Sequence, residues 1–522
     1  MLGLSTLFWM SSTGARVLIS FRIICTVVLL SWLLTPRTPC AKVTGPPGQV
    51  SLAFFDRSGR QLSAAAAQAL MTSNPPHAKD RDSETDVLID PTNLAVITKH
   101  PLRPVGNNLV FNVSGAPPVA LAVNWPTATG YSLLILDNMG KGFASPGTIN
   151  FTFQAAKDSR KRLDDALAAR PDYRRSNQFQ LLYDSADKHL QAGNASTDER
   201  VNGSEGALAL DDLTRATDLL LSEYGIQYAK AHAAVAPPWI GVTIDDIGHY
   251  QRSLDVAKKI TEPYTWIRIV FDPESKIGDY DDVVAAAKRV GLKVLGLPID
   301  SHAAAKYVTT QDYVERVRAV VGHFPEVDAW EVGNEVNGKW LITAPSQVPS
   351  GKAFGPVSEK INASARLVRQ MRPGAMSVLT LYWQLGTDEP QWSTFNWARA
   401  NLLASTRDSI NVVLLSTWVD DAPMGLAFDR VMRELRAEFP GKQIGLGELG
   451  YWNKDTSKAW WAYDTNVDKA RKRIAEQYYP ASLGYEKSIG GVFWWYFKQE
   501  MADHDTPLRS VVVNLTNGIK TH

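Results

Sequence analysis

The chain has 522 residues, of which 45% are hydrophobic and 21% are charged, and these fractions are typical of a folded globular protein. The formal net charge of +1 at pH 7 excludes the strong global field that favours nucleic acid or an acidic membrane as a partner. A chain of this length can form a large core and more than one domain. We therefore expect several domains and no nucleic-acid partner.

Residues 1–41 are predicted to form a signal peptide. Arg16 and Arg22 precede a short apolar run over residues 23–34, which is the arrangement of an export signal. The apolar run alone is short for a membrane span, but extending it towards the N-terminus nearly reaches that length, so an uncleaved membrane anchor is the alternative. The chain has two cysteines, Cys25 and Cys40, and both lie in this segment. We predict an exported protein, periplasmic or extracellular, without disulfides in its mature part.

Residues 42–155 are predicted to form a β-rich accessory domain. Up to about residue 100, the frequent Pro, Gly, Ser and Asp residues indicate loops and a few short strands. Apolar and β-branched runs then alternate with Gly, Pro and Asn turns, which is typical of a small antiparallel sandwich. The expected strands are Leu109–Val113, Ala120–Trp125, Tyr131–Leu136 and Thr148–Phe153.

Residues 156–236 are predicted to form a helical connector, because the apolar residues now recur with the period of an α-helix. The expected helices are Lys157–Ala169, Asn177–Ala192 and Leu208–Ala231. A polar, glycine-containing stretch over Asn194–Glu205 is expected to be a linker between the last two helices.

Residues 237–522 alternate between short apolar strands and helices. The expected strands are Trp239–Thr243, Thr265–Phe271, Lys293–Pro298, Ala329–Gly333, Met376–Tyr382, Asn411–Thr417, Gln443–Gly447 and Gly490–Tyr496. The helices include Tyr280–Val290, Gln311–Val321, Val357–Met371 and Leu426–Phe439. Eight such units predict an α/β fold, a (β/α)8 TIM barrel. An open doubly wound sheet is the alternative, and the absence of a glycine-rich fingerprint after the first strand disfavours it.

In a (β/α)8 barrel the active site lies at the carboxyl ends of the strands. Strand 2 carries Arg268, strand 4 leads to Asn334 and Glu335, and strand 7 leads to Glu448. Further candidates for substrate binding lie at other strand ends: His302, Tyr382, Trp418, Trp494, Trp495 and Lys498. Tryptophan faces are suitable stacking platforms for sugars, although packing in the core is the commoner use of any one Trp.

Other acidic residues at the strand ends are interpreted as solvated loop charges or helix caps. They are Asp245, Asp246, Asp300, Asp420 and Asp421. No spacing typical of a calcium loop occurs among them, so we predict no metal and no cofactor.

The ordered set of Arg268, Asn334, Glu335 and Glu448, with a Trp on strand 8, resembles the signature of the clan A glycoside hydrolases. The resemblance covers the last 285 residues or so. It implies that Glu335 is the general acid/base, with a raised pKa, and that Glu448 is the nucleophile. It also implies that Arg268 lowers the pKa of Glu448 and that Asn334 binds the sugar 2-hydroxyl. Retaining enzymes hold the two carboxyl groups about 5 Å apart.

The sequence departs from this signature on strand 6. Many members of the clan have a Tyr or His there that contacts the nucleophile, whereas Ser416, Thr417 and Trp418 occupy the place in this chain. The parts before the barrel are similar in architecture to glycosidases encoded with bacterial exopolysaccharide systems, and to the β-xylosidase and α-L-iduronidase branch. These likenesses imply a polysaccharide or oligosaccharide substrate.

Three alternatives remain open. The two glutamates could be surface residues at strand–loop junctions, and Arg268 could form a structural ion pair. The protein could also be a non-catalytic carbohydrate-binding or scaffold protein on the same barrel. A barrel enzyme of another chemistry is the third alternative, but no phosphate-binding glycine loop occurs near strands 7 and 8.

Overall fold

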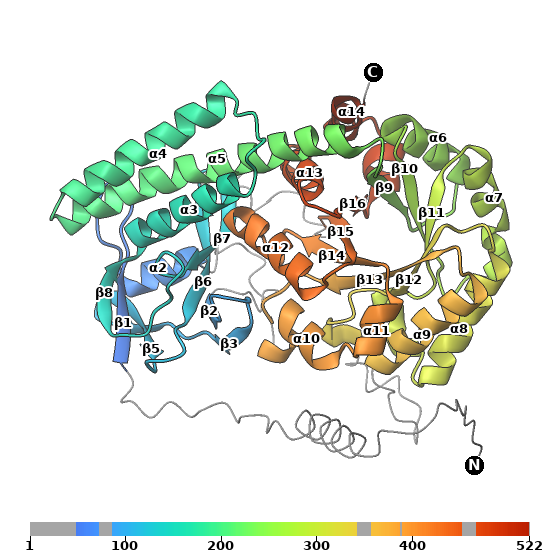
Figure 1. The fold of residues 1–522 in the computed structure, drawn as a ribbon, viewed down its shortest axis with the longest axis horizontal. Helices are drawn as coiled ribbons and strands as arrows, with labels where there is room; N and C mark the ends of the chain where they lie inside the picture. Colours follow the sequence, from blue (N-terminus) through green and yellow to red (C-terminus); the bar gives the residue numbers. More distant parts are fainter. Residues whose placement is uncertain (1–47, 72–85, 342–356, 387–388, 452–465, 521–522) are drawn as a thin grey trace, which may run out of the picture. The chain divides into compact units, whose positions relative to one another are not determined.

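The computed structural model describes residues 48–71, 86–341, 357–386, 389–451 and 466–520 (Figure 1). The predicted signal segment, residues 1–41, lies outside these described residues, and residues 47–522 form one compact unit. Within the described residues, none of the helices is both long enough and apolar enough to span a membrane.

Two four-stranded sheets form the N-terminal part of this unit. The first has the strand order β4-β5-β1-β8 and contains β1 (Gly48–Ala53), β4 (Arg103–Val105), β5 (Asn108–Val113) and β8 (Gly147–Asn150). The second has the order β3-β2-β6-β7 and contains β2 (Asp86–Ile89), β3 (Val96–Lys99), β6 (Ala120–Thr127) and β7 (Gly130–Leu136). Apolar side chains from both sheets share one core, so the predicted sandwich-like region is present.

This region differs from the prediction in two respects. Strand β1 pairs with β8 in parallel, so the sandwich is not wholly antiparallel. A helix, α2 (Ala64–Met71), also lies where the sequence indicated loops and short strands. Its buried residues Ala64, Ala67 and Met71 belong to the core between the sheets.

Three long helices follow: α3 (Phe151–Ala168), α4 (Asn177–Ala195) and α5 (Glu199–His232). The predicted strand Thr148–Phe153 is therefore wrong in its second half. The Asn150 side chain accepts a hydrogen bond from the Phe153 backbone N–H at 3.2 Å and caps helix α3. Such a cap gives a partner to one of the backbone N–H groups in the first turn, which have no acceptor within the helix, and so favours the start of a helix here.

Helix α5 begins inside the predicted linker, which is the second error in this region. Asp198 caps the helix by accepting a hydrogen bond from the Arg200 backbone N–H at 3.0 Å. Glycine is needed farther along, because a Cβ atom on Gly203 would lie 2.3 Å from the Cβ of Phe55. Tertiary packing therefore selects glycine within a helix, where its intrinsic propensity is low.

The C-terminal part is a closed barrel of eight parallel strands, so the predicted (β/α)8 fold is confirmed (Figure 1). The strands are β9 (Trp239–Ile244), β10 (Thr265–Val270), β11 (Lys293–Leu297), β12 (Ala329–Gly333), β13 (Met376–Tyr382), β14 (Val412–Trp418), β15 (Gln443–Gly450) and β16 (Gly490–Trp494). Each overlaps the strand predicted for it.

Helices separate the strands of the barrel along the chain. The α-helices are α6 (Tyr250–Thr261), α7 (Asp281–Arg289), α8 (Thr310–His323), α9 (Val357–Met371), α10 (Thr394–Asn401), α11 (Ala404–Ser409), α12 (Phe428–Glu438), α13 (Val467–Leu483) and α14 (Pro507–Ile519). Shorter helical turns are η1 (Ile277–Tyr280), η2 (Ser301–Lys306), η3 (Lys339–Leu341), η5 (Pro390–Trp392), η6 (Gly425–Ala427) and η8 (Lys498–Ala502). Helix α5 packs against α13 and α14.

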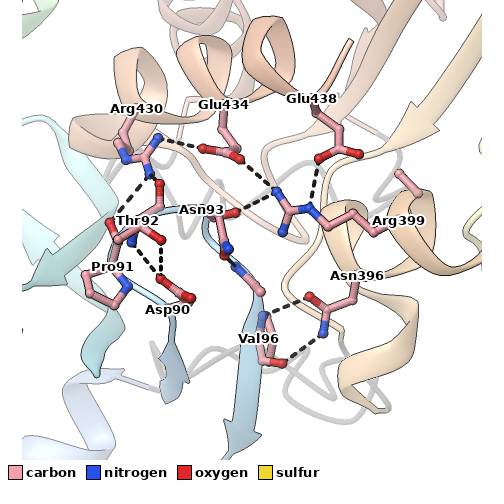
Figure 2. A network of polar contacts seen from close by, with 12 residues as sticks. Asp90, Pro91, Thr92, Asn93, Val96, Asn396, Arg399, Arg430, Glu434 and Glu438 are labelled. Atoms are coloured by element: carbon pink, nitrogen blue, oxygen red, sulfur yellow. Dashed lines mark hydrogen bonds and ion pairs between the residues drawn. The ribbon is translucent and has the colours of Figure 1, made fainter. Parts of the chain in front are cut away.

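Polar contacts connect the second sheet to helices α10 and α12 (Figure 2). The Asn396 side chain accepts a hydrogen bond from the Val96 backbone N–H at 3.0 Å and donates one to the Val96 carbonyl at 2.8 Å. Arg399 donates to the Asn93 carbonyl at 2.9 Å and pairs with Glu434 at 2.7 Å. The β-rich region is thus joined to the barrel by paired polar groups as well as by apolar packing.

Candidate active site

Two glutamates lie at the carboxyl ends of β12 and β15, which are on the same rim of a parallel barrel. Glu335 and Glu448 are each 3% exposed. Both side chains line one cavity of about 350 Å³. The structure therefore brings together the two carboxyl groups that the strand pattern identified.

The backbone at Glu335 has an unusual conformation. Its φ angle is +46°, in the left-handed region that residues other than glycine seldom adopt. The register between β12 and β13 also shifts between Glu331 and Gly333, just before this point. Such strain is kept where the surrounding structure holds it, and it is common at functional sites.

Glu448 accepts two hydrogen bonds on the same oxygen. The Arg268 guanidinium donates from Nη2 to Oε1 at 2.8 Å, and the Asn334 amide donates from Nδ2 to Oε1 at 2.9 Å. Burial raises the pKa of the Glu448 carboxyl to about 7, and the charge of Arg268 opposes this rise. Both donors favour the ionised form of the carboxyl.

Glu331 is a third carboxylate in the same network, and the sequence analysis did not identify it. Arg268 donates to it from Nε at 2.7 Å and from Nη2 at 3.2 Å. Asn334 donates to it at 3.0 Å. A signal was available, because alternate residues of a strand point to the same face, and Glu331 shares the inward face of β12 with Ala329.

These contacts correct the expected role of Asn334. Its Nδ2 atom donates to both Glu331 and Glu448, and its Oδ1 atom accepts a hydrogen bond from the Ser301 backbone N–H at 2.9 Å. The amide is 2% exposed and is fully engaged by the protein. In this structure Asn334 joins two carboxylates, and it has no donor left for a sugar hydroxyl.

Glu335 has neutral donors around it. The Ser301 hydroxyl donates to Oε2 at 3.0 Å, and the Trp418 indole N–H donates to Oε1 at 3.2 Å. Burial raises the pKa of Glu335 well above its usual value, and the nearby charges of Glu448 and Asp300 raise it further. The proton is therefore held more firmly by Glu335 than by Glu448, which has Arg268 as a partner.

Strand β14 is the strand on which the sequence departs from the clan A signature. Trp418 contacts Glu335 through its indole, as described above, and the Ser416 hydroxyl lies 3.4 Å from the backbone nitrogen of Glu448, which donates to it. Strand β14 therefore reaches both glutamates, but it reaches the Glu448 main chain and not its carboxylate.

The loop after β11 adds Asp300 and His302 to the cavity wall. Asp300 caps the turn η2 by accepting a hydrogen bond from the His302 backbone N–H at 2.9 Å, as the interpretation of such residues as caps predicts. Burial opposes ionisation of Asp300, but hydrogen bonds from His302 and the charge of Arg268 keep its pKa below the usual value. The hydrogen bond to Asp300 raises the pKa of His302.

Aromatic side chains form much of the remaining wall. They are Trp340, Tyr382, Trp418, Trp495 and Tyr496. The rings of Trp340 and Tyr382 meet edge to face with their centroids 5.0 Å apart. Trp495 lies over the Arg268 guanidinium, at 5.4 Å from the ring centroid. The cavity is thus suited to a ligand with both apolar faces and hydroxyl groups.

Four predicted substrate-binding residues line the cavity: His302, Tyr382, Trp418 and Trp495. Its wall also contains residues that were not predicted to bind substrate, namely Asp300, Ser301, Trp340, Asp421 and Tyr496. Asp421 was interpreted as a solvated loop charge, but it accepts a hydrogen bond from the Tyr382 hydroxyl. Trp340 follows the Asn–Glu pair closely in sequence, and that proximity was the available signal.

Two expected site residues lie elsewhere. Trp494 is fully buried, and its indole donates to Glu500 at 2.7 Å, because alternate residues of β16 point to opposite faces. Lys498 forms an ion pair with Asp246. Neither residue lines the cavity, so both assignments to substrate binding are corrected.

The described residues contain no group of three or more His, Cys, Asp or Glu side chains arranged to hold a metal ion. No family model matches the chain, and no curated protein matches its sequence.

Several solved structures are similar to part of the chain. One is a thermostable mutant of a xylanase from Cellvibrio japonicus, with 17% identity over 55% of this chain and 99% of that chain, and a TM-score of 0.39. A xylanase from Paenibacillus barcinonensis has 13% identity over 52% of this chain and 90% of its own, with a TM-score of 0.37. An endo-1,4-β-D-mannanase from Thermotoga petrophila has 12% identity over 54% of this chain and 99% of its own, also with a TM-score of 0.37.

Proposed function

We propose that this protein is a glycoside hydrolase that cleaves a polysaccharide or oligosaccharide with retention of anomeric configuration. Glu335 is the general acid/base, and Glu448 is the nucleophile. The observation on which this proposal rests is the unequal surroundings of two buried carboxyl groups in one cavity.

The two carboxyl groups differ in their donors. Glu448 accepts from the Arg268 cation and from Asn334, whereas Glu335 accepts from a serine hydroxyl and an indole. A cationic donor stabilises the ionised state that a nucleophile needs, and neutral donors in a buried site permit a protonated acid. Pairs of titratable groups whose environments separate their pKa values are typical of acid and nucleophile assignments.

In the first step Glu448 attacks the anomeric carbon while Glu335 gives its proton to the glycosidic oxygen. The bond between the anomeric carbon and that oxygen breaks, and a covalent ester joins the sugar to Glu448. In the second step the deprotonated Glu335 accepts a proton from water as the water oxygen attacks the same carbon. The ester bond breaks, Glu448 is regenerated as a carboxylate, and two inversions give net retention.

The aromatic walls support a sugar as the ligand. Trp340 and Trp495 both line the cavity, and aromatic rings pack against the apolar faces of pyranose rings. Asp300, His302 and Asp421 in the same wall can bond hydroxyl groups. Export to the periplasm or the extracellular space is part of this proposal, and the apolar run over residues 23–34 supports it.

The experiment is hydrolysis of a panel of plant, bacterial and host polysaccharides by the protein lacking residues 1–41. The variants Glu335→Gln and Glu448→Gln are assayed beside it, and the anomeric configuration of the first product is followed by proton NMR. We expect hydrolysis with retention, lost by a factor of about 10⁴ or more in Glu448→Gln, since no nucleophile remains.

Three results would contradict the proposal. Inversion of configuration would show that Glu448 acts as a general base that activates water, and not as the nucleophile. Activity that survives in Glu448→Gln would remove the proposed nucleophile. Binding of a glycan without hydrolysis, equal in all three proteins, would favour the non-catalytic alternative.

A further inference from the structure

Glu331 receives three hydrogen bonds from two residues that also contact Glu448. Arg268 donates to it from Nε and Nη2, at 2.7 and 3.2 Å, and Asn334 donates from Nδ2 at 3.0 Å. The same Arg268 Nη2 and Asn334 Nδ2 atoms donate to Oε1 of Glu448. Arg268 and Asn334 therefore donate hydrogen bonds to Glu331 and Glu448 at the same time.

Glu331 cannot act by touching the substrate. Its side chain is 1% exposed, and it is not among the residues that line the cavity. The only route by which it can influence chemistry in the cavity is through Arg268 and Asn334, or through its charge. Its bidentate pairing with Arg268 also restricts the guanidinium to one plane, because the fork of an arginine is rigid.

We propose that Glu331 is a positioning residue for Glu448. It fixes Arg268 and Asn334 so that both donate to Oε1 of the nucleophile, and this leaves Oε2 to attack the anomeric carbon. The inference rests on the proposed glycosidase function and deepens it, because it adds a third carboxylate to the machinery.

The charge of Glu331 has an effect opposite to that of its hydrogen bonds. Charged and titratable groups face Glu448 from several elements: Arg268, Asp300, His302, Glu331, Glu335 and Tyr496. After burial, the charge of Arg268 lowers the pKa of Glu448, and the charges of Asp300 and Glu331 raise it. Removing the charge of Glu331 should therefore lower the pKa of the nucleophile.

The test compares Glu331→Gln with Glu331→Asp. A glutamine has one acceptor oxygen for three donated hydrogen bonds and no charge, so it alters both the geometry and the field. An aspartate keeps the charge but withdraws the carboxylate by one methylene. Asp429→Asn is the matched control, because Asp429, on helix α12, is also buried and also contacts two arginines. It accepts a hydrogen bond from Arg170 at 2.5 Å and forms an ion pair with Arg433 at 2.7 Å.

For Glu331→Gln we expect the acid limb of the kcat/KM profile to move to lower pH by about one unit. For Glu331→Asp we expect kcat to fall about 10- to 100-fold with little change in KM, because misplacement of the nucleophile affects chemistry more than binding. Its acid limb should move to higher pH, because the charge is kept while Arg268 and Asn334 donate less well to Glu448. Asp429→Asn should lower the melting temperature and leave the pH profile and kcat unchanged.

An unchanged kcat in Glu331→Asp, or an acid limb of that variant that does not move to higher pH, would overturn the proposal. So would a pH profile in Asp429→Asn that moves as much as that of Glu331→Gln. If Glu331→Gln does not fold, the Glu331→Asp result decides alone.

A second readout separates this inference from the glycosidase proposal. Carbon-13 NMR titration of glutamate-labelled protein, assigned with Glu448→Gln, measures the Glu448 carboxyl directly and requires no turnover. A higher Glu448 pKa in Glu331→Asp, which keeps the charge, supports the positioning role even if the wild type hydrolyses nothing, in which case the glycosidase proposal alone fails. An unchanged titration overturns the positioning role in either case.

Discussion

The Arg268 guanidinium lies 2.8 Å from the Glu448 carboxylate, measured from Nη2 to Oε1, and both side chains are at most 4% exposed. An ion pair this far from solvent is little screened by salt. It is also costly to break, because the remaining charge would stay buried without a partner. The pair therefore links the stability of the barrel interior to the ionisation of the proposed nucleophile.

Arg268→Lys should keep the positive charge and lose the planar pair of donors of the guanidinium. A lysine ammonium is a point charge without the planar fork, so it cannot keep the bidentate geometry with Glu331 while it contacts Glu448. We therefore expect the cation to move away from Glu448. We expect kcat/KM to fall roughly 100-fold and its acid limb to move to higher pH, since a weaker cationic partner disfavours the carboxylate. Kinetics across pH 4–9 would measure both effects.

Arg407→Lys is the control for the exchange itself. Arg407 pairs with Glu438 at 2.7 Å and does not line the cavity. Its variant should keep the wild-type profile. If Arg268→Lys also keeps it, Arg268 does not influence the nucleophile.

Glu335→Gln should separate the two chemical steps. Without a proton donor, polysaccharide hydrolysis should fall by a factor of about 10² to 10⁴. An aryl glycoside whose leaving group needs no proton should still transfer its sugar to Glu448. Added azide is an anionic nucleophile that needs no general base, so it should attack the anomeric carbon in place of water, break the ester bond and release Glu448. Burst kinetics and a glycosyl azide product would be measured. Equal loss on both substrates, without rescue by azide, would contradict the assignment.

The same variant should change how stability depends on pH. The folded-state pKa of Glu335 is raised well above its usual value, so its contribution to stability is full at low pH and is lost as pH rises through the folded pKa. Glu335→Gln cannot ionise, and we expect it to melt about 1–3 °C above the wild type at pH 8, with less difference at pH 5.

Calorimetry at several pH values would measure this difference. Glu486→Gln is the control, because the Glu486 side chain is 59% exposed and does not line the cavity. A lower melting temperature for Glu335→Gln at pH 8 would show that the ionised glutamate is well accommodated.

Asn396→Ala should weaken the junction between the sheet and the barrel shown in Figure 2. The change removes two hydrogen bonds to the backbone of Val96, a residue that is 5% exposed. The Val96 N–H and carbonyl then lose these partners. We expect a loss of about 1–3 kcal/mol in the free energy of unfolding. Asn401→Ala on the same helix removes a single bond, to the Trp397 carbonyl, and should cost less. Urea unfolding would measure both, and equal costs would argue against the junction.

The barrel was predictable because its strands are short apolar runs between polar helices. Met376–Tyr382 and helix Val357–Met371 have the same bounds in the structure as in the prediction. The local sequence pattern gave a wrong prediction where tertiary packing determines the structure. Helix α5 is an example, because it continues through the glycines that lie against Phe55 and Phe153. Phe151 was predicted to lie in a strand, but the cap formed by Asn150 makes it the first residue of helix α3.

Local periodicity and chain order were enough to predict the eight parallel strands and the placement of Glu335 and Glu448 at strand ends. Two features depend on the closed barrel instead: Glu331 shares Arg268 and Asn334 with Glu448, and Trp495 faces the cavity while Trp494 faces away from it. Arg268 lies 180 residues from Glu448 in the chain. Which side chains meet over such a separation depends on strand stagger and register shifts in the closed barrel, and no local pattern encodes them.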